Sequence, residues 1–354
     1  MGRAVRALAL CDEFGIDRLR FVERSDKEIG PEQIRIQPLV VSLNYRDLLM
    51  VKGLYNPRQP LPLIPCSDAL AVVTEVGSSV TSLVPGTRVC PVFCPGWLDG
   101  ALSRETLRST LGGPLDGTLA TSMILHQEEV VQVPDFLSDA QASTLPCAAL
   151  TAYHALFGEG RPLETGQTVL VQGTGGVSVF AMQFALAIGA KVIATSKSDE
   201  KLSRLESLGV DMTINYREEP SWGRRVAKFA NASQGVDHVV EVGGAGTLEE
   251  SLSAVRAGGT ISLIGVLAGT SRPLNILPIL MRNIRLQGIF VGSRTLFEEM
   301  LGFMEQHQVV PIVDRVFDFD DAVEAFRYLG RGEHFGKVCV RVSDPTPISS
   351  NPRQ

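Results

Sequence analysis

The stretch from Val169 to Ser178 restricts the fold of this chain more than any other. The apolar run Val169–Val171 predicts a strand, a glycine-rich turn follows, and the mostly apolar run Val179–Ile188 is typical of a buried helix. A strand that passes through such a turn directly into a helix brings unpaired backbone N–H groups and the positive end of the helix dipole to one point. A pyrophosphate fits that point, so we expect a dinucleotide ligand.

The spacing of this turn is that of the G-x-G-x-x-G fingerprint, with serine in place of the last glycine. A glycine-rich turn is also common without any ligand, but here a second apolar run, Lys191–Thr195, follows the helix and completes a βαβ unit. We expect Ser178 either to leave the helix slightly farther out or to cap the phosphate end with its hydroxyl. The residues assigned to the cofactor in this turn are Gly173, Gly175, Gly176, Val177 and Ser178.

The end of the second strand indicates which dinucleotide binds. NAD-dependent enzymes usually place a carboxylate there for the ribose hydroxyls, whereas this chain has Thr195–Lys197. Hydroxyls and lysines attract a 2′-phosphate, and Asp199–Glu200 are interpreted as the first turn of the next helix, with Ser198 as its N-cap. We therefore expect NADPH; the alternative is a solvated loop with incidental lysines. The assigned residues here are Thr195, Ser196 and Lys201.

Composition excludes several classes of partner. The net charge is −6 and no long basic run occurs, which argues against nucleic acid. No run of about 18 apolar residues is present, so no membrane partner is expected. The six cysteines are scattered, as in reduced cytoplasmic proteins, and Cys90 and Cys94 form the only close pair, too few for a structural zinc site.

The pattern of the chain predicts an α/β fold with two domains. The first 130 residues indicate short strands broken by glycine and proline, whereas helices and strands alternate from about residue 138, which favours a doubly wound parallel sheet. A helix over 318–329 and a strand over 336–342 follow, and 345–354 is expected to be a disordered tail. The predicted domains are 1–134 with 307–354, and 135–306. The strands expected in the parallel sheet are 168–172, 191–195, 211–214, 237–241, 260–265 and 286–290.

These landmarks together resemble the medium-chain dehydrogenase/reductase superfamily, over about residues 4 to 342. Besides the glycine-rich loop, the matching segments are Leu43–Asp47, Pro65–Asp68, Thr144–Tyr153 and Phe335–Lys337. The chain looks most like the zinc-free, quinone-oxidoreductase-like branch, which also stands close to zinc-type alcohol dehydrogenase-like proteins. The resemblance implies a GroES-like β-rich catalytic domain, a Rossmann cofactor domain inserted in it, and an active site in the cleft between them.

Many members of this superfamily are zinc alcohol dehydrogenases, and this chain departs from their ligand pattern. Asn44 stands where they have the first cysteine, the triplet Cys66–Asp68 replaces Gly-His-Glu, and only Cys147 keeps a typical ligand. Catalytic zinc needs about three protein ligands, so we expect no metal and interpret Cys147 as a small packed residue. The residues 95–117, where the structural zinc lobe would lie, contain no cysteine.

Without zinc, another group has to stabilise negative charge on the substrate oxygen. Reduction of an activated C=C bond lowers this demand, because the hydride goes to the β-carbon and hydrogen-bond donors can stabilise the enolate. By the resemblance, Tyr45 is the expected donor to the substrate oxygen, Asn44 a partner of the substrate or cofactor ribose, and Asp47 a residue that orients them. The alternative is that residues 45–47 merely begin a helix, with structural ion pairs of Arg46 and Asp47.

The resemblance also assigns residues along the rest of the cofactor. Thr151 is expected on the nicotinamide-ribose side, and Lys201 and Tyr216 around the 2′-phosphate and adenosine. Ligands bind outside the carboxyl ends of parallel strands, which places later strand ends at the nicotinamide half, although their glycines also suit ordinary turns. The residues expected there are Gly243, Ile264, Val266, Phe290 and Val291.

The sequence thus favours an NADPH-dependent, zinc-independent oxidoreductase that reduces an enone, an enoyl compound or a quinone. Two alternatives stay open: a metal-free carbonyl reductase or alcohol dehydrogenase, and a cofactor-binding protein with little turnover. The expected partner besides the small-molecule substrate is a second copy of the chain, since members of the superfamily usually pair through the edge of the Rossmann sheet, here around 286–290. The segment Pro95–Arg108 is a candidate cover for the pocket.

Overall fold

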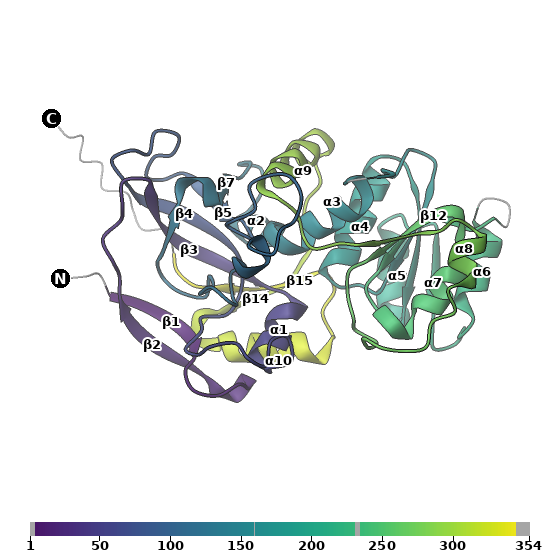
Figure 1. Cartoon of the computed structure of the whole chain (residues 1–354), viewed down its shortest axis with the longest axis horizontal. Coiled ribbons are helices and arrows are strands. Elements are labelled where there is room, and N and C mark those ends of the chain that lie inside the picture. The colour runs from purple at the N-terminus through teal and green to yellow at the C-terminus, as the bar shows by residue number, and fades with distance from the viewer. Residues whose placement is uncertain (1–3, 159, 231–233, 345–354) are drawn as a thin grey trace. The chain divides into compact units, whose positions relative to one another are not determined.

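The structure is a computed structural model that describes residues 4–158, 160–230 and 234–344, so the expected tail from Pro345 lies outside the described residues. The chain forms two compact units, which Figure 1 shows in ribbon form. One unit is built from the described residues of Met1–Cys147 and Gly292–Gln354, and the other from Ala148–Val291. No helix of the described residues is long and apolar enough to cross a membrane.

The first unit is rich in β-structure, as the short strands of the N-terminal sequence predict. Its main sheet has the order β14-β15-β3-β4-β5-β7, with β6 paired to β3, and β1 and β2 form a separate antiparallel pair. The strands are β1 (Ala4–Leu10), β2 (Leu19–Ser25), β3 (Gln33–Leu43), β4 (Asp68–Val76), β5 (Arg88–Pro91), β6 (Met123–His126), β7 (Val130–Gln132), β14 (Val313–Asp318) and β15 (Lys337–Arg341). The helices are α1 (Tyr45–Val51), α2 (Asp139–Ala142), α9 (Arg294–His307) and α10 (Ala322–Arg331).

The last strand completes the sheet begun by the N-terminal residues. β15 pairs antiparallel with β3, so that Val338 lies opposite Leu43. Val338 and Val340 are fully buried in the same apolar core as Phe326 of α10. The C-terminal helix and strand therefore rejoin the first unit, as the sequence predicts.

The second unit is a six-stranded parallel sheet with helices between its strands. Its order, β10-β9-β8-β11-β12-β13, is the doubly wound order of dinucleotide-binding folds. The strands are β8 (Thr168–Gln172), β9 (Lys191–Ser196), β10 (Met212–Asn215), β11 (Val236–Glu241), β12 (Val255–Leu263) and β13 (Arg285–Gly288). The helices are α3 (Leu150–Phe157), α4 (Gly176–Ala187), α5 (Asp199–Ser207), α6 (Trp222–Phe229), α7 (Leu248–Ala254) and α8 (Leu277–Met281).

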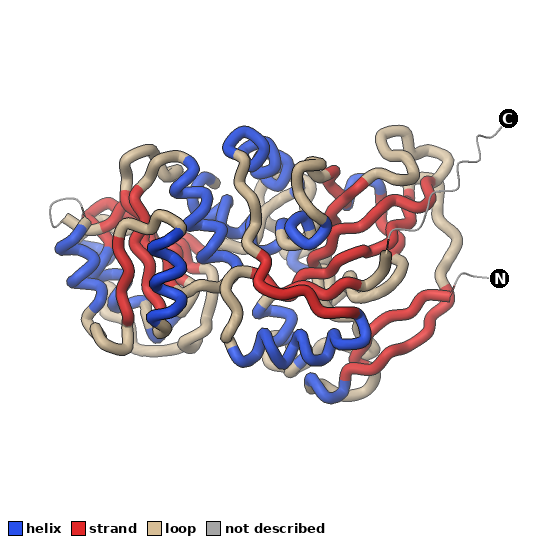
Figure 2. Tube along the Cα trace, turned by 180° about the vertical axis from the view of Figure 1, so that it is seen from behind, coloured by secondary structure: helices blue, strands red, loops and turns tan. Residues whose placement is uncertain are grey.

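Both faces of this sheet are covered, which explains why its strands read as continuous apolar runs. Trp222 of α6 and Leu252 of α7 pack on Leu170 and on other side chains of one face. Val169 and Val171, which alternate with Leu170 along the strand, are buried as well, and α4 contacts β8 and β9. Figure 2 shows the strands of this unit as red tubes flanked by blue helices.

The boundaries of the two units differ from the predicted domain limits at both crossovers. The compact unit of the parallel sheet covers 148–291, whereas the sequence was divided at 135–306. Helix α9 lies with the first unit because the N–H groups of Arg294 and Thr295 donate to the carbonyls of Trp97 and Leu98 at 3.0 Å. A helix that follows a strand does not reveal in its sequence which unit it packs on.

Candidate active site and cofactor site

The predicted catalytic residues lie where β3 ends and α1 begins, within the first unit. Asn44 is the N-cap of α1, and its backbone N–H donates to Oδ2 of Asp47 at 2.8 Å. Tyr45 is the first helical residue and 43% exposed, while Asp47 is fully buried. The helix start agrees with the alternative interpretation of residues 45–47, and the capping contact explains why Asn and Asp stand three residues apart.

Lys337, the first residue of β15, lies beside Asn44, a placement that the sequence did not reveal. Its Nζ donates to the carbonyl of Leu43 at 2.8 Å and to Oδ1 of Asn44. Because an ammonium group can only donate, this contact fixes the amide of Asn44 with its oxygen toward Lys337. The amide NH2 faces Asp68 and lowers the pKa of that carboxyl, without a hydrogen bond of standard geometry.

Two fully buried carboxyl groups lie in this cluster. Burial raises the pKa of Asp47 to about 6, with the charge of Arg46 acting in the opposite direction. Burial also raises the pKa of Asp68, against the lowering effects of Lys337 and of the Ser67 hydroxyl. Ser67 Oγ donates to Asp68 Oδ1 at 2.6 Å, and the backbone N–H of Cys147 donates to Oδ2 at 3.1 Å. The cluster therefore combines two carboxyl groups, Asp47 and Asp68, with two basic side chains, Arg46 and Lys337, away from water.

The three positions that match zinc ligands in related dehydrogenases meet around Asp68, but their donor groups do not fit a catalytic zinc. The amide oxygen of Asn44 is directed to Lys337, and the Ser67 hydroxyl is directed to Asp68. Cys147 is the only one of the three positions with a typical zinc ligand, whereas a catalytic zinc needs about three. Across residues 4–158, 160–230 and 234–344, no group of three His, Cys, Asp or Glu side chains is placed to hold a metal ion.

Arg46 ties the start of α1 to the neighbouring loop. Its Nη1 donates to the carbonyl of Leu111 at 2.9 Å and its Nη2 to that of Gly113 at 3.2 Å, while the guanidinium lies 4.7 Å from the ring centre of Phe93. Arg46 also approaches Asp47 at 3.4 Å. Arg46 and Asp47 thus have the structural ion pair of the alternative interpretation, whereas the side chain of Tyr45 belongs to an exposed residue.

The segment Pro95–Arg108 is docked on helix α9. The side chain of Trp97 is buried, and its indole N–H donates to the carbonyl of Gly100 at 2.8 Å. The carbonyls of Trp97 and Leu98 accept hydrogen bonds from the first turn of α9. The large aromatic side chain of this segment is therefore part of the packing of the first unit.

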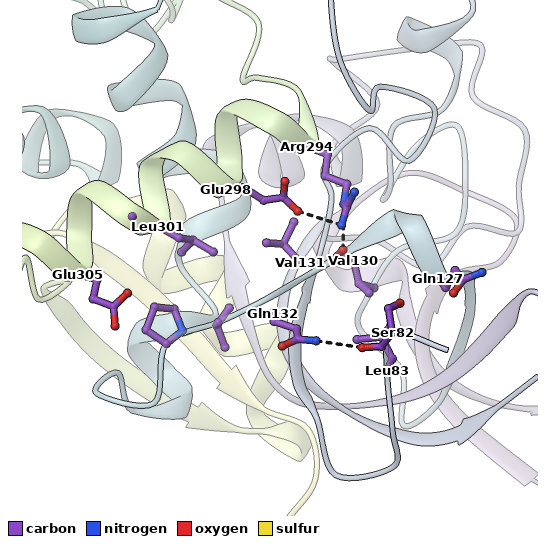
Figure 3. A pocket seen from close by; sticks show the side chains of 13 residues that line it. Ser82, Leu83, Gln127, Val130, Val131, Gln132, Arg294, Glu298, Leu301 and Glu305 are labelled. Carbon is purple, nitrogen blue, oxygen red and sulfur yellow. Dashed lines mark hydrogen bonds and ion pairs between the residues drawn. The ribbon is translucent and has the colours of Figure 1, made fainter. Parts of the chain in front are cut away.

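A separate hollow of about 460 Å³ lies between β7 and α9 in the first unit. Figure 3 shows Arg294 bound to Glu298 on the helix side and Gln132 bound to the carbonyl of Ser82 on the strand side. None of the predicted site residues lines it. The hollow is therefore distinct from the polar cluster around Asn44.

The predicted pyrophosphate loop joins β8 to α4 in the second unit. Gly173 has a φ of +73°, and a Cβ at Gly173 or Gly175 would meet no atom within 4 Å, so the loop borders open space. Gly175 is the N-cap of α4 and has no side chain to bind the first N–H groups of the helix. Such free N–H groups around an open space fit a pyrophosphate. The hydroxyl of Ser178, by contrast, donates to the carbonyl of Gln172 at 2.6 Å and so attaches the helix to its strand.

The end of β9 has the groups that were assigned to the 2′-phosphate. Ser196 ends the strand, and Ser198 is the N-cap of α5, where its Oγ accepts from the N–H of Lys201 at 3.4 Å. The Asp199 carboxylate accepts from Asn215 Nδ2 at 2.7 Å, and Asn215 lies opposite Ser196 in the neighbouring strand β10. Tyr216 is 40% exposed. The adjacent Lys197 and Arg217 are exposed as well, and Arg217 is a basic residue that the sequence reasoning did not single out.

The later strand ends pack tightly on one another. Ile264 donates its N–H to the carbonyl of Glu241 at 2.9 Å, and a Cβ at Gly265 would lie 2.4 Å from the carbonyl oxygen of Val242. The carbonyl of Val291 is 2.7 Å from Nδ1 of His154, and Val291 has a φ of +45°, which is unusual for a β-branched residue. The remaining assigned residues of this region are Thr151, buried on α3, and Gly243, Val266 and Phe290 in the loops after β11, β12 and β13.

Comparison with known proteins agrees with both units. Residues 30–135 match the model of the alcohol dehydrogenase GroES-like domain, and residues 176–306 match that of zinc-binding dehydrogenases. A zinc-type alcohol dehydrogenase-like protein of Schizosaccharomyces pombe is 40% identical over 334 residues, which cover 93% of this chain and 96% of that protein. The 2-methylene-furan-3-one reductase of Solanum lycopersicum is 30% identical over 319 residues, or 88% of this chain and 72% of that protein.

Among solved structures, a putative alcohol dehydrogenase from Sinorhizobium meliloti 1021 superposes with a TM-score of 0.88 at 40% identity. The match covers 96% of this chain and 99% of that one. The GroES-like domain, the parallel sheet and nearly full-length relatives all agree. The chain therefore belongs to the medium-chain dehydrogenase/reductase superfamily and is an oxidoreductase of that family.

Proposed function

We propose that this chain is an NADPH-dependent, zinc-independent reductase of an activated C=C bond or a quinone. The observation that supports this most is the contact of Lys337 with Asn44, because it directs a fixed ammonium group and an amide to the place where zinc-dependent relatives have a metal ligand. A metal cation and a buried lysine would repel each other at such short range. The reduction of a conjugated C=C bond needs less help from a Lewis acid than that of an isolated carbonyl.

NADPH, when bound, supplies the hydride. The residues of this chain stabilise negative charge on the substrate oxygen and hold the groups that do so. Tyr45, an exposed residue, donates its hydroxyl to that oxygen, and Asp47 holds the backbone of Asn44, which in turn keeps Lys337 in place. The proton for the α-carbon comes from water or a side chain.

The preference for NADPH rests on charge at the end of β9. The residues 195–198 at the end of β9 include no acidic residue, the carboxylate of Asp199 is bound to Asn215, and Lys197, Lys201 and Arg217 are basic. We expect Lys201→Ala to weaken NADPH binding about tenfold and to leave NADH binding within about twofold, because NADH has no 2′-phosphate for the lysine to contact. Isothermal titration with both dinucleotides measures this. An equal loss for both would contradict a 2′-phosphate contact at Lys201.

The proposed reaction is tested by NADPH oxidation with a panel of small enones, an enoyl thioester, quinones and aldehydes, each with and without a strong zinc chelator. We expect turnover with an enone, an enoyl compound or a quinone that the chelator does not change. Loss of turnover on chelation would contradict the zinc-independent reaction.

Tyr45→Phe should lower kcat with the best substrate about 100-fold, and an unchanged kcat would exclude Tyr45 as the donor.

The alternative reaction, metal-free interconversion of carbonyls and alcohols, is favoured by the Sinorhizobium meliloti structure named a putative alcohol dehydrogenase. The name of the tomato relative favours the C=C reaction instead, since a 2-methylene-furan-3-one has a C=C bond conjugated to a ketone. Turnover confined to the aldehydes of the panel would select the alternative. NADPH binding without turnover on any member would indicate a cofactor-binding protein.

We further propose that the chain forms a homodimer through the edge strand β13 and works in the cytoplasm. β13 ends the parallel sheet, and apolar side chains of the neighbouring α8 are exposed, with Leu280 at 75% and Met281 at 73%. An open strand edge beside exposed apolar side chains favours pairing with a second chain. All six cysteines are free thiols, as is usual in a reducing compartment.

A further inference from the structure

The side-chain carboxyl group of Glu241 is buried and is held by a set of hydrogen-bond donors. It ends β11 and is 0% exposed, and no ion pair involves it among the described residues. Its two oxygens accept from two backbone N–H groups, two hydroxyls and one amide. These donors are Gly243 N (2.8 Å), Gly244 N (2.9 Å), Thr247 Oγ1 (2.6 Å), Ser251 Oγ and Gln172 Nε2 (2.8 Å).

The loop after β11 winds closely around this carboxylate. Gly244 has a φ of +82°, and a Cβ there would lie 2.9 Å from the Cα of Val266. A Cβ at Gly243 would lie 2.2 Å from Thr247 Oγ1. The path of residues 242–247 therefore depends on the contacts of their N–H and hydroxyl groups with Glu241, and this loop contains Gly243, which we assign to the nicotinamide half of the cofactor site.

The same carboxylate connects this loop to the pyrophosphate loop through one residue. The side chain of Gln172 donates to Glu241 and accepts from the N–H of Gly243 at 3.3 Å. The main-chain carbonyl of Gln172 accepts from Ser178 in the first turn of α4, and the next residue is Gly173. Two strand ends and one helix start are thus joined by a short chain of hydrogen bonds.

We propose that Glu241 is a positioning residue of the cofactor site, which holds the nicotinamide-side loop in register with the pyrophosphate loop. The inference rests on the proposed use of NADPH. Fixed strand ends present their N–H groups to a ligand at little entropic cost, whereas a loop that has to be ordered on binding lowers affinity.

The variant Glu241→Gln changes this arrangement with almost no change in shape. Its amide nitrogen cannot accept a hydrogen bond, so either the three donors to Oε1 or the two donors to Oε2 lose their acceptor. On the side of Oε2 the new NH2 group would meet the NH2 group of Gln172, which removes the hydrogen bond between Gln172 and residue 241 and leaves only the contact of Gln172 with the N–H of Gly243 to join β8 to the loop. The adenosine end of the site, at β9 and α5, has no contact with Glu241.

The matched control lies on the same strand. Asp237, near the other end of β11, is also a buried carboxylate, which accepts from the N–H of Thr168 at 2.8 Å and pairs with Arg256 at 2.6 Å. It lies at the amino end of the parallel strands, opposite to the ligand edge. Asp237→Asn therefore disturbs a buried network of similar kind without affecting the cofactor loops.

The test measures the dissociation constants of NADPH and of adenosine 2′,5′-bisphosphate, which has only the adenosine half, together with urea unfolding. We expect Glu241→Gln to weaken NADPH about tenfold and the bisphosphate less than twofold, and Asp237→Asn to change neither. Unchanged NADPH binding by Glu241→Gln, or an equal loss of both ligands in both variants, would overturn the positioning role. If Glu241→Gln does not fold, Thr247→Val, which removes one donor, is expected to weaken NADPH alone by about threefold.

The same measurements distinguish a failure of the positioning role of Glu241 from a failure of the proposed use of NADPH. A wild-type chain that binds neither ligand would contradict the use of NADPH itself. A wild-type chain that binds NADPH while Glu241→Gln binds it equally well would contradict only the role of Glu241.

Discussion

Asp47 has a buried carboxyl group whose pKa is raised by burial from 3.8 to about 6. The folded chain therefore holds this proton more tightly than the unfolded chain, and the stabilisation is fully present below about pH 4 and is lost as the pH rises through 6. A shift of about two units corresponds to about 3 kcal/mol. We expect Asp47→Asn to remove this loss of stability at rising pH. The amide oxygen of the new side chain still accepts from the N–H of Asn44, and the amide does not ionise.

The free energy of unfolding in urea, measured from pH 4 to 7 for the wild-type chain and Asp47→Asn, checks this expectation. The difference in the free energy of unfolding between the wild-type chain and Asp47→Asn should change by about 3 kcal/mol across the range, in favour of the variant at high pH. A parallel pH dependence of both proteins would show that Asp47 does not titrate in this range. Asp135→Asn, at a fully exposed carboxylate, is the control.

The ammonium group of Lys337 donates to two buried oxygen atoms, and no other cationic side chain of the described residues donates to them. Removal of its Nζ in Lys337→Met leaves the carbonyl of Leu43 and the amide oxygen of Asn44 without their donor and removes the positive charge that lowers the pKa of Asp68. We expect a loss of about 3 kcal/mol in the free energy of unfolding. Lys197→Met, at an exposed lysine, should change it by less than about 0.5 kcal/mol. Similar values for the two variants would contradict the structural importance of Lys337.

Lys337 and Glu241 also show what a sequence does not reveal at the scale of single residues. The start of α1 was foreseen only as the alternative interpretation of residues 45–47, and the structure shows both the helix and the Arg46–Asp47 ion pair. The contact between Lys337 and Asn44 joins residues far apart in the chain and exists only because β15 pairs with β3. Glu241 reads as an ordinary strand end until the donors from β8 and α7 are placed around it.

Among the elements, helix α4 shows why the altered fingerprint still forms the expected turn. The hydroxyl of Ser178 donates to the carbonyl of Gln172 and so attaches α4 to β8. The glycine of the usual fingerprint would instead leave room for the helix to lie closer to the strand. We expect Ser178→Ala to lower the free energy of unfolding by about 1 kcal/mol and to change NADPH affinity less than threefold, since the hydroxyl serves the strand. Ser178→Gly should cost slightly more than Ser178→Ala, because glycine loses more backbone freedom on folding.

Thermal and urea unfolding, together with NADPH titration, measure both variants of Ser178. If Ser178→Ala keeps the stability of the wild-type chain but loses tenfold in NADPH affinity, the hydroxyl binds the phosphate end of the cofactor. That is the second possibility that the sequence leaves open for Ser178.

The strands of the parallel sheet agree with the predicted ranges to within one or two residues, apart from the start of β12. Expected over 260–265, β12 begins at Val255, since Val255 already lies opposite Val236 of β11. The pair Gly258–Gly259 resembles a turn in the sequence, but here it accompanies a shift of register within the strand. Local glycine content predicts turns well only where the neighbouring strand does not offer partners.

At the scale of the whole molecule, the exposed apolar side chains of α8 predict self-association. We expect the wild-type chain to sediment as a dimer at micromolar concentration and Leu280→Asp to shift it toward the monomer, because a charge would be buried without a partner. Val84→Asp, at an exposed valine of the other unit, is the control and should leave the dimer intact. A monomeric wild-type chain, or a dimer unaffected by Leu280→Asp, would contradict this interface.

The fold class, the doubly wound order and the cofactor loop could be predicted because each depends on short segments with strong periodicity. The unit boundaries could not, since they depend on which surface α9 packs against. The substrate is not predictable for a similar reason: its recognition depends on exposed side chains such as Tyr45, whose environment is not encoded in any local pattern.

The return of β15 to β3 has a consequence for the order in which the chain is made. The parallel-sheet unit is one continuous segment, so all of it has been synthesised before the ribosome reaches α9. Strand β3, by contrast, waits with part of one edge unpaired until Val338 arrives to lie opposite Leu43. Domains fold as units during synthesis, so the nascent chain passes through a stage with a finished cofactor unit and an open sheet. Lys337 comes to Asn44 only with that last strand, so the polar cluster around Asn44 stays incomplete until β15 has been translated.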